Sequence, residues 1–481
     1  MAILPTVSWL LIFTLFALPL LFFPFTYLAF EMPKVFLLYI FSAFAAYILL
    51  ISGYKLGKLS IIYWVYLIFF AWIIITAIFG LSWQQSFWGS YFRMQGILTW
   101  ICYFLLFFIS GKVFENHYFK KYACLAILIA STVTATLALI QFISFWFFGH
   151  TAQLLYSGRV ISTFGQPNFL GAFLVMSLPF IWYLFKQVKG LPKSFVILGF
   201  IVTILGIIST FSRSAYIGFI LLALIWGIYH YRLLFAGITF LIILFALLAN
   251  LFPKLVYQEW YRFQVDTISK WTAENRLIIA QKSIKLIAQK PLTGYGIENF
   301  SLAFPTVVTA DDLGLKDIVV DSSHNLFLDL AVNTGLVGLG LFLTICITTF
   351  IRSLKHEAFT RTAMASAVAF LAIHQFSPVA IVPAALFWLS LGIINGPVLS
   401  HTNLSRNLKF IFSIVGISLP IITSSLIIQT IRADILFREA SAYEVSDIQR
   451  AIKLDNDAIK LAPWIQFYSI RRNFLLKQPG Y

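Results

Sequence analysis

The sequence predicts an all-α polytopic membrane protein with about 12–13 transmembrane helices. Two features of its composition support this. Of its 481 residues, 60% are hydrophobic and only 11% are charged, whereas about a quarter of the residues in a soluble domain are charged. Apolar stretches of about 20 residues recur along most of the chain, and each is long enough to cross the hydrocarbon core of a bilayer.

Thirteen apolar stretches are interpreted as membrane spans. The first lacks a basic leader and a small-residue cleavage signature, so we expect it to be a retained anchor. The sequence around Ser377 and Pro378 fits either a kinked helix pair or a re-entrant hairpin. The predicted spans are 8–30, 34–52, 59–80, 95–111, 122–148, 167–185, 194–211, 214–229, 233–252, 323–351, 362–378, 380–397 and 410–430.

Basic residues in the short loops predict the orientation. Loops after even-numbered spans carry 14 Lys and Arg, whereas short loops after odd-numbered spans carry only Lys34, Arg93, Arg159 and Arg213. Positive charge in short loops stays on the cytoplasmic side, so we expect a cytoplasmic N-terminus. The predicted units are a bundle of nine spans (1–252), an extracytoplasmic loop (253–322), four further spans (323–430) and an extracytoplasmic tail (431–481).

This asymmetry also explains the net charge of +16. Twelve of the excess charges come from the cytoplasmic loops, whose 14 basic residues face only Glu115 and Glu357. A nucleic-acid partner needs a basic patch on one face, and the sequence predicts none. The three cysteines lie inside apolar runs (Cys102, Cys124 and Cys346), which indicates packing rather than a disulfide or metal framework.

Three of the few outward-facing cations are arginines with polar neighbours. Arg93 lies in "SYFRMQG", Arg159 in "SGRVISTFGQPNF" and Arg213 in "STFSRSAYIGF". A single arginine at such a position is commonly a headgroup anchor that reaches toward lipid phosphate. Three on one face, each in polar company, favour a shared anion site.

The outer loop contains a predicted amphipathic helix in "TAENRLIIAQKSIKLIAQKPLTGYGIENF". Its expected apolar stripe comprises Leu277, Ala280, Ile284 and Ile287, at spacings of three and four residues. Arg276 lies in the first turn, off this stripe.

Pro291 and Gly294 are expected to end this helix. Gly294 and Gly296 lack the strand–turn–helix context of a phosphate-binding loop. The favoured interpretation is a tight turn that packs the insert onto the bundle.

His324 stands where the outer loop meets the tenth span, among Asp321, Ser322, Ser323 and Asn325. Ser322 or Ser323 is expected to cap the following helix, so the cap itself does not require a histidine. An imidazole titrates near neutrality and can accept a proton from a hydroxyl group. A catalytic role for His324 is therefore predicted.

Asp329 lies five residues further on, within the predicted tenth span. Ionisable groups there tend to be paired or functional, and whether Asp329 pairs with another helix is left open.

The order of four motifs resembles the O-antigen ligase superfamily. They are "GRVISTFGQPNFLGAF", "STFSRSAYIGF", "ENRLIIAQKSIKLIAQKPLTGYGIENF" and "SSHNLFLDLAVNTGLVGLGLF". The superfamily includes lipopolysaccharide O-antigen ligases, O-antigen polymerases and bacterial O-linked protein oligosaccharyltransferases. The resemblance covers about 90–350 and is strongest over 155–345.

The resemblance implies inverting, metal-independent transfer of a glycan from a polyprenyl pyrophosphate carrier to an acceptor hydroxyl of a sugar or protein. It implies no cofactor and a site on the outer face of the bacterial inner membrane. Arg213 and Arg276 resemble the family's pyrophosphate-binding arginines, and His324 its catalytic histidine. Guanidinium groups bind phosphate oxygens bidentately. Arg159 and Asn168 are secondary candidates, as are the residues Arg93, Asp321 and Asn325.

The tail after the last span resembles a tetratricopeptide-type helical pair, in which "AIKLAPW" ends the second helix. One such unit cannot bury its own apolar face, so we expect it to pack on the outer loop or on a partner. This extension favours the polymerase and protein-directed members of the family over plain ligases.

Two other classes of protein are alternatives. A transporter of lipid-linked glycans is expected to show broken spans, midplane charges and inverted repeats, but the sequence gives a single such charge and no convincing repeat. A non-catalytic scaffold whose tail recruits envelope enzymes is the third interpretation.

Overall fold

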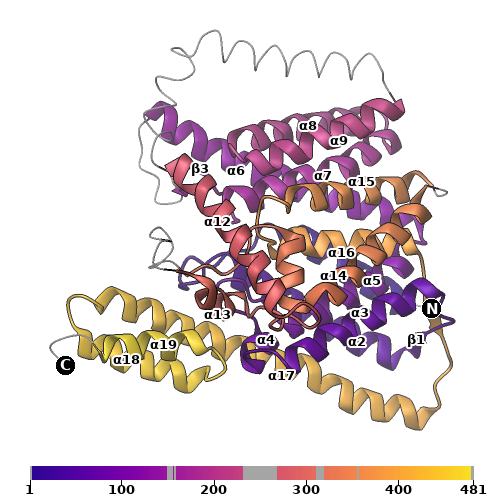
Figure 1. The fold of residues 1–481 in the computed structure, drawn as a ribbon. Coiled ribbons are helices and arrows are strands. Elements are labelled where there is room, and N and C mark those ends of the chain that lie inside the picture. The colour runs from indigo at the N-terminus through magenta and orange to yellow at the C-terminus, as the bar shows by residue number, and fades with distance from the viewer. Residues whose placement is uncertain are drawn as a thin grey trace.

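The computed structural model describes residues 3–148, 155–156, 159–230, 268–309, 312, 319–354 and 357–477, and helices dominate them (Figure 1). The predicted all-α polytopic membrane fold is confirmed. Within these ranges, seven helices are long and apolar enough to cross a membrane. They are α2 (Glu31–Ile51), α3 (Ile61–Ile78), α6 (His117–Phe148), α7 (Pro167–Gln187), α8 (Leu191–Ser209), α14 (Leu326–Ser353) and α17 (Arg406–Tyr443).

Other elements complete the described chain. Two pairs of short antiparallel strands are formed by β1 (Tyr54–Leu56) with β4 (Leu399–His401), and by β2 (Leu155–Tyr156) with β3 (Arg159–Val160). The remaining helices are α1 (Ile3–Ala17), α4 (Trp83–Trp88), α5 (Ile97–Val113), α9 (Arg213–His230), α12 (Ile268–Gln289), α13 (Phe300–Ala303), the 3-10 helix η1 (Phe304–Val307), α15 (Ala358–Ile373), α16 (Ile381–Asn395), α18 (Ile448–Leu461) and α19 (Gln466–Leu475).

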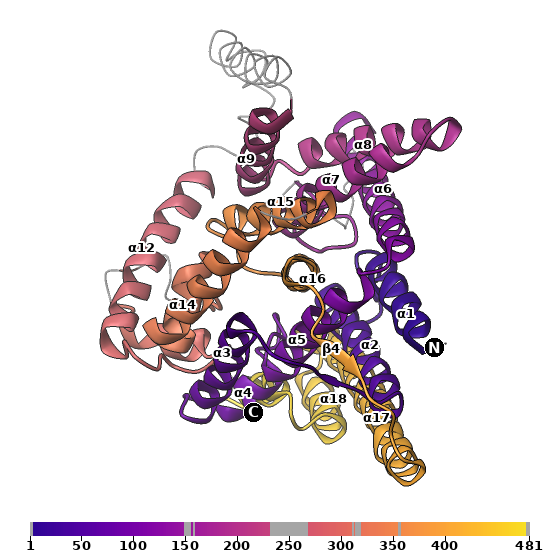
Figure 2. The same cartoon turned by 90° about the vertical axis from the view of Figure 1, so that its right-hand side faces the viewer.

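Helix α16 is the centre of the bundle (Figure 2). All 15 of its residues are buried, as expected for a helix that is apolar on every side. It packs against α5, α14 and α15. The segment around Ser377 and Pro378 therefore separates two helices, α15 and α16.

The first predicted span is too long, because α1 ends at Ala17. The residues that follow are not helical up to Phe30, and α2 begins at Glu31. Pro19 and Pro24 lie in this stretch, and proline cannot donate the backbone hydrogen bond that a helix interior needs. The predicted span 233–252 lies outside the described residues.

Helix α14 is broken at Gly335, whose φ of 69° and ψ of 178° are not helical. The turn after α12 fills the break. The backbone N–H groups of Tyr295 and Gly296 donate to the carbonyls of Val332 and Asn333, both over 2.9 Å. The prediction that Gly294 and Gly296 form a tight turn on the bundle is confirmed.

Helix α12 packs with a different face from the one predicted. The buried residues include Ile279, Ser283 and Leu286, which face α14 and η1. Leu277 and Ile284, assigned to the predicted stripe, are 63% and 58% exposed. The helix has apolar residues on two sides, and periodicity alone does not indicate which side meets a neighbour.

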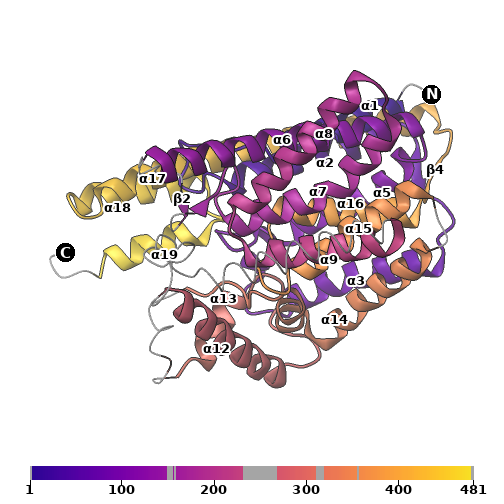
Figure 3. The same cartoon turned by 90° about the horizontal axis from the view of Figure 1, so that it is seen from above.

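The C-terminal tail is helical, as predicted, and "AIKLAPW" does end α18. Among the described residues it packs on α17 and on the short connection that contains α4, whereas we expected the outer loop or a partner. In two views, α12, α13, α18 and α19 lie at one end of the bundle, and the N-terminus, β1 and β4 lie at the other (Figures 1 and 3).

Candidate active site beside α9, α12 and α14

His324 is held in the loop directly before α14. Asn325 is the N-cap of this helix, because its Oδ1 accepts from the backbone N–H groups of Phe327 and Leu328, both at 3.0 Å. The expectation that Ser322 or Ser323 caps the helix is therefore wrong. Ser322 instead accepts the backbone N–H of His324 over 3.1 Å.

Asn325 also ties the loop to the central helices. Its side-chain amide donates to the backbone carbonyl and the side-chain oxygen of Gln375, both over 3.1 Å. The carbonyl of His374 accepts the first N–H of α14, from Leu326, over 2.7 Å. The loop that carries His324 is thus fixed to the end of α15.

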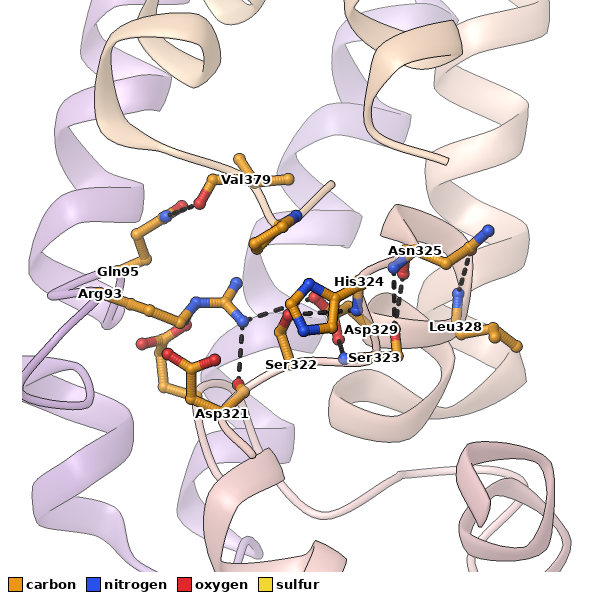
Figure 4. Close-up of polar contacts among 12 residues, drawn as sticks. Arg93, Gln95, Asp321, Ser322, Ser323, His324, Asn325, Leu328, Asp329 and Val379 are labelled. Carbon is orange, nitrogen blue, oxygen red and sulfur yellow. Dashed lines mark hydrogen bonds and ion pairs between the residues drawn. The ribbon is translucent and has the colours of Figure 1, made fainter. Parts of the chain in front are cut away.

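Arg93 lies beside His324 and is surrounded by carboxylates (Figure 4). Its guanidinium forms ion pairs with Glu298 at 3.3 Å and with Asp329 at 3.4 Å. It also donates to the backbone carbonyl of Asp321 over 3.0 Å. Asp329, whose role the sequence left open, accepts the backbone N–H of Ser323 over 2.6 Å.

The carboxylates around Arg93 keep it charged. Burial alone would lower the pKa of Arg93, but the carboxylates of Glu298, Asp329 and Asp321 outweigh it and raise that pKa above its ordinary value. Arg93 therefore stays charged, and its Nη1 donates to protein oxygens. In this position it supports the His324 loop, and its charge is already paired with carboxylates.

A second network lies around the start of α9. Arg159, on β3, donates to the carbonyl of Thr210 over 3.1 Å and to Oδ1 of Asn168 over 3.3 Å. The same Oδ1 accepts the hydroxyl of Ser212 over 2.8 Å. Asn168 and Ser212 are buried, so this network fixes the turn that precedes Arg213.

Backbone strain concentrates in these two networks. Among the residues that the structure describes, five other than glycine have φ in the left-handed region: Met94 (51°), Ser162 (49°), Phe211 (48°), Glu298 (63°) and His324 (57°). Three belong to or adjoin the Arg93 network, and two adjoin Arg159 or Arg213. Such conformations persist only where the surroundings hold them, and they cluster at functional sites.

Arg213 and Arg276 differ from Arg93 in remaining accessible. Arg213 is the first residue of α9. Arg276 lies in the third turn of α12, because this helix begins at Ile268, and the prediction that it lies in the first turn is wrong. Both side chains are exposed. Partial desolvation and then the positive charge of Arg213 lower the pKa of Arg276. Among the described residues neither has a carboxylate partner. Two uncompensated guanidinium groups near one another are suited to binding an anion.

The same electrostatics connect Arg276 to His324. Burial, followed by the positive charges of Arg276 and Arg93, lowers the pKa of His324 from 6.5 to about 4. Its imidazole is therefore neutral at physiological pH and able to accept a proton. Its Nδ1 is buried and has no hydrogen-bond partner among the described residues, which is uncommon for a buried polar atom.

Sequence reasoning missed Glu298 and the junction with Gln375. Glu298 lies inside "GYGIENF", the motif whose glycines predict a tight turn. An acidic residue in an outer loop does not by itself indicate a role in the site, because its importance depends on the arginine with which it pairs. Its partner Arg93 is 205 positions earlier in the chain, beyond the reach of local patterns.

The fold and this site define a class of protein: a polytopic helical membrane protein with an accessible arginine pair and a neutral histidine at one end. Residues 198–343 match the family model described as O-Antigen ligase. This range contains Arg213, Arg276 and His324 and lies within the region 155–345 whose motifs resemble that superfamily. The resemblance to the O-antigen ligase superfamily, which includes O-linked protein oligosaccharyltransferases, is confirmed.

Two curated proteins of Acinetobacter baylyi (strain ATCC 33305 / BD413 / ADP1) are similar. The ComP-specific O-oligosaccharyltransferase is 30% identical over 206 residues, which cover 41% of this chain and 36% of that protein. The General O-oligosaccharyltransferase is 28% identical over 241 residues, which cover 47% of this chain and 41% of that protein. The chain thus spans less than half the length of either relative.

Proposed function

We propose that this protein is a glycosyltransferase of the O-antigen ligase type. It moves an oligo- or polysaccharide from a polyprenyl pyrophosphate carrier to an acceptor hydroxyl, on the outer face of the bacterial cytoplasmic membrane. The observation that carries the proposal is the convergence of Arg213, Arg276 and His324, from three separate elements, at one end of the bundle. The match of residues 198–343 to the O-antigen ligase family supports it.

Arg213 and Arg276 hold the donor pyrophosphate in this proposal. Their guanidinium groups provide planar donor pairs for phosphate oxygens, and they stabilise the charge that develops as the leaving group departs. The lipid tail of the donor remains in the bilayer beside the spanning helices. These two charges fill the electrostatic role that a metal has in other glycosyltransferases, so the route is metal-independent.

His324 acts as the general base. Its neutral imidazole takes the proton of the acceptor hydroxyl, and the hydroxyl oxygen attacks the anomeric carbon from the face opposite the pyrophosphate. The bond from that carbon to the phosphate oxygen breaks, and its electron pair leaves with the pyrophosphate. The configuration at the anomeric carbon is inverted. The proton then passes from His324 to solvent or to the departing group.

Arg93 has a supporting role here, together with Asp321 and Asn325. Arg93 fixes the carbonyl of Asp321 and the carboxylate of Asp329, and Asn325 caps α14. Arg159 and Asn168 support the turn before Arg213 in the same way. These residues position the reacting groups without touching the bond that breaks.

The second candidate function is O-linked protein glycosylation, in which the acceptor hydroxyl belongs to a protein. The observation that favours it is the similarity to two proteins named as O-oligosaccharyltransferases. The third candidate function is that of a polymerase, which uses the same site and in which the acceptor hydroxyl belongs to another copy of the glycan.

The experiment is deletion of the gene in its native host, followed by complementation with wild type or His324→Ala. Surface glycans are separated on a gel, and the masses of envelope proteins are measured. Accumulation of lipid-linked polymer with loss of anchored chains identifies a ligase. Single repeat units identify a polymerase, and lost protein glycan mass a protein-directed transferase. Full complementation by His324→Ala, at normal protein level, contradicts the proposal.

A further inference from the structure

The connection 83–94, which contains α4, contacts the C-terminal tail with one set of its side chains. The amide of Gln84 donates to the carbonyl of Pro463 over 3.2 Å and to that of Trp464 over 3.0 Å. The ring of Trp88 stacks on the ring of Trp464 with 5.4 Å between their centroids. These contacts join the turn between α18 and α19 to the end of the bundle.

Tyr91 completes this set by meeting a buried carboxylate. Asp434 of α17 is fully buried and accepts the hydroxyl of Tyr91 and, over 3.0 Å, the hydroxyl of Tyr468. The backbone N–H of Leu28 donates to the same carboxylate over 3.0 Å. The rings of Tyr91 and Phe467 stack at 4.5 Å. One side chain thus joins α17, α19, the connection 83–94 and the turn before α2.

A second set of side chains on the same connection supports the His324 loop through Glu298. The amide of Gln85 donates to the carbonyl of Glu298 over 2.7 Å. The backbone N–H and hydroxyl of Ser90 donate to its carboxylate over 3.1 Å and 2.8 Å. Arg93 then pairs with the other carboxylate oxygen of Glu298 and with Asp329.

The two sets alternate along the connection. Gln84, Trp88 and Tyr91 meet the tail, whereas Gln85, Ser86, Ser90 and Arg93 meet the segment around Glu298. Helix α4 ends at Trp88, where Gly89 has a φ of 93°, so Ser90, Tyr91 and Arg93 lie in the turn that follows the helix. A displacement of the tail therefore acts on the same short segment that positions Arg93.

We propose that the C-terminal tail is a positioning element for the transfer reaction, and that the Asp434 junction holds Arg93 and Glu298 in place behind His324. Asp434, Tyr91 and Tyr468 are positioning residues, since they act on His324 only through the connection 83–94. This inference rests on the proposed function. The other role open to the tail is that of a packing module that stabilises the bundle and leaves the site unchanged.

The charge around His324 distinguishes these two roles. His324 is flanked by Arg93 from the connection 83–94 and by Arg276 from α12, with Asp321 and Asp329 on its own segment and Glu298 behind Arg93. If the tail positions Arg93, its loss moves one positive charge away from the imidazole. The histidine then accepts a proton more readily. A packing module has no such effect.

The test compares Asp434→Asn and the double variant Gln84→Ala/Trp464→Ala with Asp455→Asn. Asp455 is a matched control, because it is also a fully buried carboxylate of the tail but pairs with Arg471 inside the tail. Full-length proteins in nanodiscs are given a polyprenyl pyrophosphate-linked oligosaccharide and the envelope fraction of the deletion host. Release of polyprenyl pyrophosphate is followed against donor concentration and pH, and each melting temperature is measured.

We expect Asp434→Asn and the double variant to lower kcat by about ten- to a hundredfold, the effect of a small misplacement of catalytic groups. Donor KM should stay within about twofold, because the donor arginines are not affected. The acidic limb of the pH profile should shift from near pH 4 toward 6.5, the ordinary pKa of histidine. Asp455→Asn should keep the kcat and acidic limb of wild type even where it lowers the melting temperature equally.

Wild-type kcat and acidic limb in both tail variants overturn the inference, as does an equal loss of kcat in Asp455→Asn. His324→Ala, included in the same series, separates this result from the proposed function. If His324→Ala is inactive and the tail variants are normal, only the positioning role of the tail fails. If His324→Ala is active, the proposed function itself fails.

Discussion

The two arginine networks at this end of the molecule use the same side chain in different ways. Around Arg93, two carboxylates and a carbonyl occupy the guanidinium, and the ion pairs are almost completely buried. Around Arg213, a second arginine, Arg159, binds a carbonyl and an amide oxygen and fixes a turn. Arg213 itself is left exposed.

A membrane protein can thus reserve some of its cations for a ligand and use others to hold its structure together. A buried arginine needs compensating charge, because desolvation of an unpaired ion is costly. An exposed arginine at the end of a helix does not, and its charge remains available to an anion. Residue type alone therefore does not identify an arginine that binds a ligand. The presence or absence of carboxylates around the arginine indicates whether its charge is available.

The largest effect should come from His324, which lies between the two networks. His324→Ala should lower kcat by roughly a thousandfold, within the usual range for loss of a general base. Transfer is measured with purified protein at saturating donor. Residual activity near that of wild type would contradict the role of His324 as the general base.

The next effect separates the accessible arginines from the buried one. Arg276→Gln and Arg213→Gln should each lower kcat/KM by about a hundredfold through lost stabilisation of the pyrophosphate. Lys at either position should recover only part of this, because an ammonium group lacks the planar donor pair. Donor saturation curves are the measurement. Curves identical to wild type for Arg276→Gln contradict its assignment to the donor.

Arg93→Gln tests whether the buried arginine affects the protonation of His324. Removing a positive charge beside His324 favours protonation, so the acidic limb of kcat/KM should move from near pH 4 toward 6.5. Above pH 7 the loss should be smaller than that of Arg276→Gln. A matched profile for Arg159→Gln, which lies in the other network, should keep its acidic limb. An unmoved limb in Arg93→Gln would show that Arg93 does not act on the histidine.

The smallest effect concerns the break in α14 at Gly335, where the turn after α12 packs against the helix. A Cβ at Gly335 would lie 2.0 Å from the carbonyl oxygen of Leu292, and the backbone there has a φ of 69°. Gly335→Ala should destabilise the fold by about 1–3 kcal/mol, seen as a lower melting temperature. Gly340→Ala, where a Cβ meets no atom within 4 Å, is the control and should change little.

Much of the architecture follows from the sequence, because a bilayer leaves few alternatives. Apolar runs of about 20 residues must be helical in lipid, and most predicted spans coincide with helices of the structure. Within the described residues the first span differs, because its hydropathy continues past Ala17 while the helix ends there, before Pro19 and Pro24. Hydropathy measures burial and does not detect where a backbone stops being helical.

The residues of the candidate site could be predicted from the sequence, but the contacts between them could not. The residues His324, Arg213 and Arg276 follow from motifs and from charge in the outer loops. The pairing of Arg93 with Asp329 joins residues 236 positions apart, and no local pattern reports such a contact. For the same reason the sequence predicted that the tail packs on the outer loop or on a partner, whereas the contact between Asp434 and Tyr91 joins it to the connection 83–94.

The contact between Tyr91 and Asp434 joins residues 343 positions apart, and this sets an order of events during synthesis. At about 5–20 residues per second, a ribosome needs roughly 20–70 seconds to proceed from the first residue to the second. Throughout that time the connection 83–94 is already made but lacks the carboxylate that anchors it. The nascent chain therefore acquires its charged catalytic groups well before it can hold them in place, and a chain truncated before α17 should remain idle in the membrane.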